Sequence, residues 1–407
     1  MRILWLTPQP PTPLEDGLNI RLRHLWEGLA TRHSLWILYL QEEPTPNPAA
    51  AARLPCIAAT AIPIQGTNGR AYRHCQDHSP EVDRGIRRFL DATPVDIVVA
   101  SSIWMVPYVQ HLAGLPVVID LVDAMSLLTY REIKGARTLP GKLRALRTWW
   151  GYRRYERRHF RSLRDLVLSS DVDARVVRSR AAQANVVVIP NGVDSEYFRP
   201  QPPETESKEL VFSGVMSFSP NHAAVMHFYS EILPRIWHVH PDLRFTVVGK
   251  SPPEELYRLT RGDPRVRITG YVPDIRPYLG RATAYVAPMI SGAGIKNKIL
   301  EAFAMAKPVV ATSLACDGLH VRSGETLLVA DGPESFARAV SAFLADPELR
   351  ARVGRQARAH VLQHYTWRQQ AERFGELLEL VGRRAGRLQP APDGFASAVD
   401  SKRKARR

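Results

Sequence analysis

Short apolar runs alternate along the whole chain with longer stretches whose apolar residues recur at helical spacing. This alternation is typical of strand and helix units that build a parallel β-sheet. The predicted strands of a first set are 3–6, 35–40, 96–100, 116–121, 166–169 and 186–189. Those of a second set are 210–213, 243–248, 266–269, 284–287, 308–311 and 326–329. The pattern therefore predicts an α/β protein with two doubly wound parallel sheets.

A polar, proline-rich segment over residues 199–208 separates the two sets of strands, as an interdomain linker would. Two Rossmann-like domains of this kind bind ligands at the carboxyl ends of their strands, which we expect to face a shared cleft. The alanine- and proline-rich segment 42–65 predicts a loose excursion. The predicted parts are a first domain over 1–200, a second domain over 201–365, a helix over 366–384 that returns to the first domain, and a disordered basic tail over 385–407.

Composition excludes several classes of protein. The chain has 407 residues, of which 45% are apolar and 23% charged, so it is long and apolar enough for two or three folded domains. No stretch approaches the roughly 18 uncharged apolar residues of a membrane span, and the start of the chain lacks a signal-peptide core. Cys56, Cys75 and Cys316 fit neither a zinc site nor a disulfide framework. We therefore expect a cytoplasmic protein.

The surplus of positive charge is concentrated in two segments. The chain carries a net charge of +15. Residues 131–164 contain 12 basic and 2 acidic residues, a net charge of +10, and residues 385–407 contain 6 and 2, a net charge of +4. Since the remainder is nearly neutral, the charge indicates a local patch and a tail, not a general surface for polyanions.

Part of the first segment, residues 141–163, mixes arginines with Trp149, Trp150 and other aromatic residues. A basic helix that carries aromatic residues can lie on an anionic membrane surface, which is one prediction for this segment. The alternative is a long helix whose aromatic residues fill the first domain's core while its arginines are solvated. Nucleic-acid binding, aided by the basic tail over 402–407, is a third interpretation, but no recognised nucleic-acid motif accompanies it. We expect no nucleic-acid partner.

The most informative motif spans residues 285–312. A strand ends near Pro288, a loop of small residues contains Gly292 and Gly294, and a helix is predicted from Ile295 to Lys307. Glycines let the backbone approach a ligand closely, and a helix start offers free N–H groups and the positive end of a dipole. These features predict a phosphate site, although a glycine pair alone also fits an ordinary strand-to-helix loop.

Charged residues strengthen that prediction. Lys296 and Lys298 supply positive charge for a diphosphate. Glu301 lies about one helical turn beyond Lys298, so both side chains can face one ligand. A carboxylate at this place can accept hydrogen bonds from two ribose hydroxyls.

The stretch resembles the donor-site motif of the retaining family 4 glycosyltransferases of GT-B fold. Further resemblance to that family covers about residues 1–380 and is stronger in the second half. The segments that carry it, in order, are Gly17 to Arg21 with His24, 188–200, 210–216, 220–221, 231–234, 245–249, 272–274 and 365–367. Within the family, the chain is most similar to sugar transferases of bacterial exopolysaccharide and exosortase systems.

The resemblance implies an enzyme that moves a sugar from a nucleotide-sugar donor to a glycan or lipid-linked acceptor, with retention, in bacterial polysaccharide biosynthesis. The first domain would take the acceptor and the second domain the donor. Such an enzyme would work in the cytoplasm, with a peripheral position on the inner face of the plasma membrane as an option. The implied donor-binding residues are Gly17, Gly214, Gly270, Tyr271, Val272, Gly292, Gly294, Ile295, Lys296, Asn297 and Glu301, and Lys298 would act on the diphosphate as a catalytic residue.

The chain also departs from the family's pattern. Ala293 stands where the family has the first glutamate of a pair, and the Arg and Lys that usually follow the strand before Gly214 are missing. Lys296 and Lys298 can substitute as counter-charges for a diphosphate leaving group. The change at Ala293 leaves two alternatives open: a nucleotide-sugar epimerase, or an inactive scaffold that binds the donor.

Acidic residues do not indicate a metal site. The chain has no Asp-x-Asp triplet of the metal-binding kind, because Asp171 and Asp173 start a helix, where carboxylates serve as caps and dipole partners. We expect no metal and no cofactor. Asp120 and Asp123 leave the end of a first-domain strand, where Asp123 can orient an acceptor hydroxyl or accept its proton as a catalytic residue. The alternative is that these two residues cap the helix that follows.

Overall fold

The computed structural model describes residues 1–12, 17–41, 54–64, 78–112, 114–135, 138–201, 208–261, 263–292 and 294–388. Predictions that concern residues 42–53, Ala293, and the tail from residue 389 onward lie outside this part of the chain. Among the described residues, neither Cys56 nor Cys316 forms a disulfide bond.

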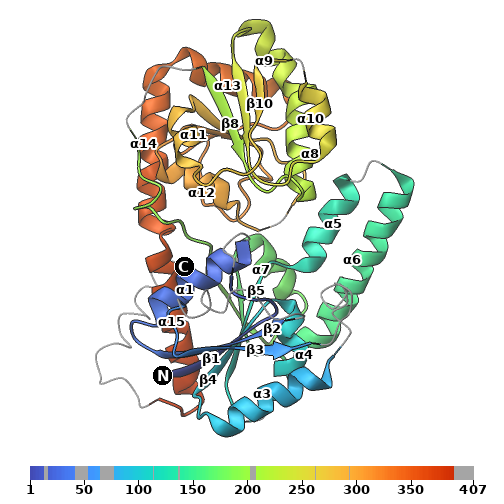
Figure 1. Cartoon of the computed structure of the whole chain (residues 1–407), viewed down its shortest axis with the longest axis vertical. Coiled ribbons are helices and arrows are strands. Elements are labelled where there is room, and N and C mark those ends of the chain that lie inside the picture. Colours follow the sequence, from blue (N-terminus) through green and yellow to red (C-terminus); the bar gives the residue numbers. More distant parts are fainter. Residues whose placement is uncertain are drawn as a thin grey trace. The chain divides into compact units, whose positions relative to one another are not determined.

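The first sheet has seven strands in the order β3-β2-β1-β4-β5-β6-β7 (Figure 1). β1 pairs in parallel with both β2 and β4, with Ile3 opposite Leu35 and Ile97. Central strands such as β4 are buried on both faces, which explains their unbroken apolar sequence. The strands are β1 (Arg2–Thr7), β2 (Ser34–Gln41), β3 (Ala58–Pro63), β4 (Ile97–Ser101), β5 (Val117–Val122), β6 (Asp165–Leu168) and β7 (Asn185–Val188).

The second sheet has six strands in the order β10-β9-β8-β11-β12-β13. β8 pairs in parallel with β9 and with β11. The strands are β8 (Glu209–Ser213), β9 (Arg244–Val248), β10 (Val266–Ile268), β11 (Ala284–Ala287), β12 (Val309–Ala311) and β13 (Leu328–Val329). The prediction of an α/β protein with two parallel sheets is confirmed.

Helices connect these strands. In the first half of the chain they are α1 (Gly17–Leu29), α3 (Pro80–Ala92), α4 (Val106–Val109), α5 (Met125–Gly135), α6 (Leu139–His159) and α7 (Asp171–Arg178). In the second half they are α8 (Ser219–His227), α9 (Leu233–Val239), α10 (Glu254–Thr260), α11 (Arg276–Arg281), α12 (Asn297–Ala304), α13 (Pro333–Ala345), α14 (Pro347–His364) and α15 (Trp367–Arg384). Within the described residues, no helix combines the length and the apolar character that crossing a membrane requires.

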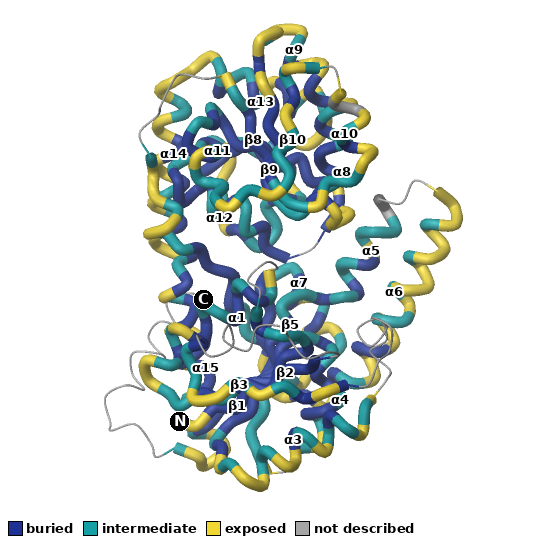
Figure 2. The backbone as a smooth tube through the Cα atoms, in the orientation of Figure 1, coloured by how far each residue is buried: buried dark blue, intermediate teal, exposed yellow. Residues whose placement is uncertain are grey.

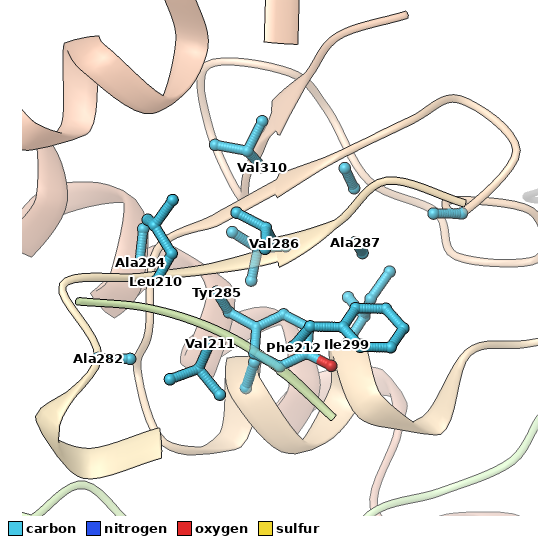
Figure 3. Packing of buried hydrophobic residues seen from close by; sticks show 14 of the residues in the cluster. Leu210, Val211, Phe212, Ala282, Ala284, Tyr285, Val286, Ala287, Ile299 and Val310 are labelled. Carbon is cyan, nitrogen blue, oxygen red and sulfur yellow. The ribbon is translucent and has the colours of Figure 1, made fainter. Parts of the chain in front are cut away.

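Packing divides the chain into two compact units. One unit contains Met1–Leu14, Trp26–Asp120 and Glu372–Arg407, and the other contains Glu15–Leu25 and Leu121–Ala371. The first unit has a core of aromatic residues, in which the Trp5 ring lies 5.9 Å from Trp26 and 5.2 Å from Phe374 between ring centroids. The second unit holds a large apolar cluster around β8, β11 and α12, part of which Figure 3 shows. The domain boundaries proposed from the sequence remain predictions.

Two local expectations were wrong. Segment 42–65 was expected to be a loose excursion, but Ala58–Pro63 forms β3, which pairs in parallel with β2. Its alternating exposed and half-buried residues suit an outer strand of the sheet, and alanines conceal that pattern in the sequence. The helix expected from Ile295 to Lys307 spans only Asn297–Ala304, because Lys296 is extended and Ala306 is left-handed with φ of 55°.

Candidate donor site

The order of strands in the second sheet reverses direction between β8 and β11. From β8 the chain continues to β9 on one side, and from β11 it continues to β12 on the other. In open parallel sheets, such a switch point leaves a crevice at the carboxyl ends of the two strands, where ligands bind. Gly214 follows β8, and the loop with Gly292 and Gly294 follows β11. The fold therefore places both predicted donor-binding segments at this point.

Lys298 is held at the crevice by two neighbours. Its Nζ donates a hydrogen bond to Asn221 Oδ1 at 2.6 Å and lies 4.3 Å from the centroid of the buried Phe212 ring. The Asn221 amide nitrogen in turn donates to the carbonyl of Val215 at 2.9 Å, in the segment that follows β8. Figure 3 shows Phe212 in the packed cluster beside β11. A packed ring and a fixed amide thus position the ammonium group.

Gly214 is required by this arrangement. Its φ is 150°, and a Cβ there would lie 2.6 Å from Asn221 Nδ2 and 2.9 Å from Lys298 Nζ. Both distances are too short for a real side chain, so any other residue would displace the amide or the lysine. Gly214 therefore belongs to the same cluster as Asn221 and Lys298.

Glu301 follows Lys298 on α12, and both side chains are half-buried. Among the described residues, the Glu301 carboxylate makes no hydrogen bond or ion pair, so its oxygens are available to a ligand. Loss of water by burial raises the pKa of Glu301 to about 7, and the charge of Lys298 partly opposes this shift. Burial also lowers the pKa of Lys298 to about 7, helped by repulsion from Lys296.

The loop after β11 is shaped by its glycines and by Lys296. Gly292 and Gly294 are buried and have φ of 110° and 66°. The Lys296 ammonium is also buried and donates to the carbonyl of Gly294 at 2.7 Å, and burial lowers its pKa. Ile295 packs into the apolar cluster, and Asn297 is the first residue of α12. Lys296 thus stabilises the loop, whereas Lys298 is presented at the end of β8.

Three of the residues that the resemblance implies for donor binding follow β10. Gly270 has φ of 70°, its carbonyl accepts from Gly249 N–H at 3.2 Å, and Tyr271 is 70% exposed. Val272 is half-buried against the apolar cluster. At Gly17, the first residue of α1, an added Cβ would meet nothing within 4 Å, so the structure shows no close approach there.

Asp123 lies in the second unit, close to the carboxylate of Asp173. It is half-buried, and its Oδ1 accepts from the Ser169 hydroxyl at 3.0 Å. Burial raises the pKa of Asp123 to about 6, and the neighbouring Asp173 carboxylate adds to that rise. A Cβ at Gly294 would lie 2.2 Å from Asp123 Oδ1, so the glycine loop and this carboxylate approach each other within the unit.

The alternative interpretation, in which Asp123 caps α5, is wrong. The backbone N–H groups at the start of α5 are bonded elsewhere: Ala124 donates to Asp173 at 2.9 Å, and Ser126 donates to Glu156 at 2.9 Å. The helix expected after Ser170 is confirmed as α7, and the Ser170 hydroxyl accepts from Asp173 N–H at its start. Asp120 is fully buried.

The Asp173 carboxylate thus accepts hydrogen bonds from a backbone N–H at the start of α5 and from a hydroxyl at the start of α7. In the part of the chain that is described, no three His, Cys, Asp or Glu side chains gather closely enough to hold a metal ion.

The contact between Asn221 and Lys298 is a feature of the candidate site that sequence reasoning missed. Asn221 was noted as part of a resembling segment, without a role. The signal available was its place at the start of the helix after β8, since side chains there can reach the same crevice as the loop after β11.

This architecture is the GT-B fold, seen in many glycosyltransferases. Among solved structures, sucrose-phosphate synthase from Thermosynechococcus elongatus superimposes with a TM-score of 0.71 at 15% identity, covering 94% of this chain and 99% of that one. HepE from Anabaena, solved in complex with UDP, gives a TM-score of 0.66 at 16% identity, covering 93% of this chain and all of that one.

Sequence comparison agrees with the fold. Residues 207–346 match the family model described as Glycosyl transferases group 1. The lipopolysaccharide core biosynthesis mannosyltransferase LpcC of Rhizobium leguminosarum is 33% identical over 113 residues, 27% of this chain and 32% of that protein. The phosphatidyl-myo-inositol mannosyltransferase of Mycobacterium leprae is 27% identical over 227 residues, 54% of this chain and 60% of that protein. The matches thus span a third to three fifths of these relatives.

Proposed function

We propose that this protein is a glycosyltransferase that takes a sugar from a nucleotide-sugar donor and passes it to a glycan or lipid-linked acceptor, in bacterial polysaccharide or glycolipid biosynthesis. The observation that carries the proposal is the cluster of Lys298, Asn221 and Glu301 at the switch point of a group 1 domain. The relatives with mannosyltransferase and lipopolysaccharide names support the same class of acceptor.

Each group has a task that suits its surroundings. The Glu301 carboxylate accepts hydrogen bonds from the two ribose hydroxyls of the donor. The Lys298 ammonium, supported by Phe212 and Asn221, binds the diphosphate and stabilises the negative charge that develops there as the bond to the sugar breaks. Asn221 keeps the amine in place before the donor arrives, so little reorganisation is needed.

The reaction proceeds with retention in this proposal. The bond between the anomeric carbon and the diphosphate oxygen breaks, and the acceptor oxygen bonds to the same face of that carbon. The acceptor proton passes to an oxygen of the departing diphosphate, so no strong protein base is needed. Asp123 orients the acceptor hydroxyl, and Lys298 supplies the counter-charge without a metal ion.

The experiment supplies UDP-, GDP- and ADP-sugars labelled in the sugar, with an extract of bacterial lipid-linked glycans as acceptor. A first thermal-shift screen against the three nucleoside diphosphates selects the base. We expect label to move into the acceptor fraction and the anomeric configuration to be kept. Label that stays on the nucleotide as a different sugar would identify an epimerase, and binding without turnover would identify a scaffold; either result would contradict the proposal.

A further inference from the structure

One face of α6 carries large apolar side chains that are exposed in the described part of the chain. This helix has 21 residues, and four of its apolar residues recur at steps of four, three and four positions. That spacing places them in one stripe along one side of the helix. They are all more than two fifths exposed: Leu139 at 71%, Leu143 at 60%, Leu146 at 46% and Trp150 at 59%.

Arginines continue the same face toward the end of the helix. Arg153, Arg154, Arg157 and Arg158 are exposed and follow Trp150 at helical spacing. Figure 2 shows much of α6 in the colour of exposed residues. With Trp150 and Arg161 they line an open groove of about 400 Å³. Within the described residues, none of these arginines pairs with a carboxylate. The face is therefore apolar over its first three turns and cationic over the rest.

The opposite face of α6 is fixed to the protein. Tyr155 and Glu156 are buried, and Glu156 Oε1 accepts from Ser126 N–H of α5 at 2.9 Å. α5 and α6 pack against each other along their lengths. The exposed stripe therefore belongs to a helix that is anchored on its other side. Substitutions on the stripe leave the buried contacts of Tyr155 and Glu156 in place.

We infer that this face of α6 docks on the surface of an anionic lipid bilayer. The leucines and Trp150 enter the interfacial region, and the arginines bind lipid phosphates. Charge decides against the other occupants. A second copy would bring arginines against arginines, with no exposed carboxylate on the stripe to pair with them. A nucleic acid would satisfy the arginines but would leave the leucines in water.

This inference goes beyond the proposed function, since it does not depend on sugar transfer. The test sediments the full-length protein with vesicles of phosphatidylcholine alone or mixed with phosphatidylglycerol. We expect pelleting with the mixed vesicles, release as salt rises because the Debye length is only about 8 Å at physiological salt, and weak binding to the neutral vesicles.

Three variants locate the surface. Changing Arg153, Arg154, Arg157 and Arg158 to Gln should lower the vesicle partition coefficient by roughly two to three orders of magnitude. Changing Leu143, Leu146 and Trp150 to Gln should lower it as well, although the charge is unchanged. The matched control removes four exposed arginines elsewhere, Arg84 and Arg87 on α3 and Arg352 and Arg355 on α14, and should pellet nearly as wild type.

Nucleotide affinity and circular dichroism of each variant confirm that it is folded. The inference fails if either variant of the α6 face pellets as wild type does, or if the control loses binding as strongly, which would make net charge the cause. It also fails if the wild-type protein does not bind anionic vesicles. In that case, a dimer that Trp150→Gln abolishes would identify a second copy as the partner. A salt-sensitive gel shift of an oligonucleotide would identify a nucleic acid.

Discussion

The half-buried Lys298 and Glu301 of the candidate donor site predict an unusual dependence of nucleotide binding on pH. In the free protein the pKa values of Lys298 and Glu301 both lie at about 7. A bound diphosphate favours the ammonium form of Lys298 and so raises its pKa. Ribose hydroxyls that donate to the Glu301 carboxylate favour its ionised form and so lower its pKa. Binding therefore acts in opposite directions on the two groups.

The sign of proton linkage follows from these shifts. One pH unit above 7, only about a tenth of Lys298 is charged while about nine tenths of Glu301 is ionised, so binding takes up about 0.8 protons. One unit below 7 the situation is reversed, and binding releases about 0.8 protons. At pH 7 the uptake and the release cancel. Nucleotide affinity should therefore be highest near pH 7 and fall on both sides.

Isothermal titration calorimetry in buffers of different ionisation enthalpy measures the number of protons directly. The ligand is the nucleoside diphosphate that gives the largest thermal shift. Lys298→Met should abolish uptake at high pH and leave release at low pH, and Glu301→Gln should do the reverse. A proton number that stays the same across this range, or uptake below pH 7 and release above it, would refute the assignment of Lys298 to diphosphate and Glu301 to ribose.

Three further outcomes are expected. Sugar transfer should survive EDTA, because Lys298 and not a metal ion stabilises the diphosphate; activity that requires added Mg²⁺ or Mn²⁺ would contradict this. Glu156→Ala should lower the free energy of unfolding, measured in urea, by about 3 to 5 kcal/mol, because Arg180 and the Ser126 N–H lose their buried partner. Glu376→Ala, at an exposed position, should change the free energy of unfolding little. Ala306→Gly should raise the free energy of unfolding by about 0.5 to 1 kcal/mol, because relief of the left-handed strain at φ of 55° exceeds the added entropy of the unfolded chain; a lower urea midpoint would show that strain is absent.

Sequence could predict those parts of the fold that depend on local pattern. The central strands were predicted closely because they are buried apolar runs. The placement of Lys298 and Glu301 one turn apart on the same helix followed from helical spacing. β3 was not predicted, because Ala58 to Pro63 forms an outer strand in which a few alanines satisfy the packing. Helix α12 begins two residues later than expected because Lys296 is extended at its start.

Contacts between distant segments could not be predicted in this way. Asn221 and Lys298 lie 77 positions apart along the chain, and they meet only because α8 and α12 begin at the same sheet edge. The approach of Gly294 to Asp123 depends likewise on tertiary packing inside the second unit. Neither contact leaves a periodic signal in the sequence, so both had to come from the structure.

The central claim is that Glu301 holds the nucleotide of a sugar donor. The most direct measurement is the affinity of wild type and Glu301→Ala for the nucleoside diphosphate identified by thermal shift, with exposed Glu348→Ala as the control. Loss of hydrogen bonds to a charged group should weaken binding by about 1.5 to 3 kcal/mol in Glu301→Ala and leave the control unchanged. Equal nucleotide affinity in wild type and Glu301→Ala would contradict the account.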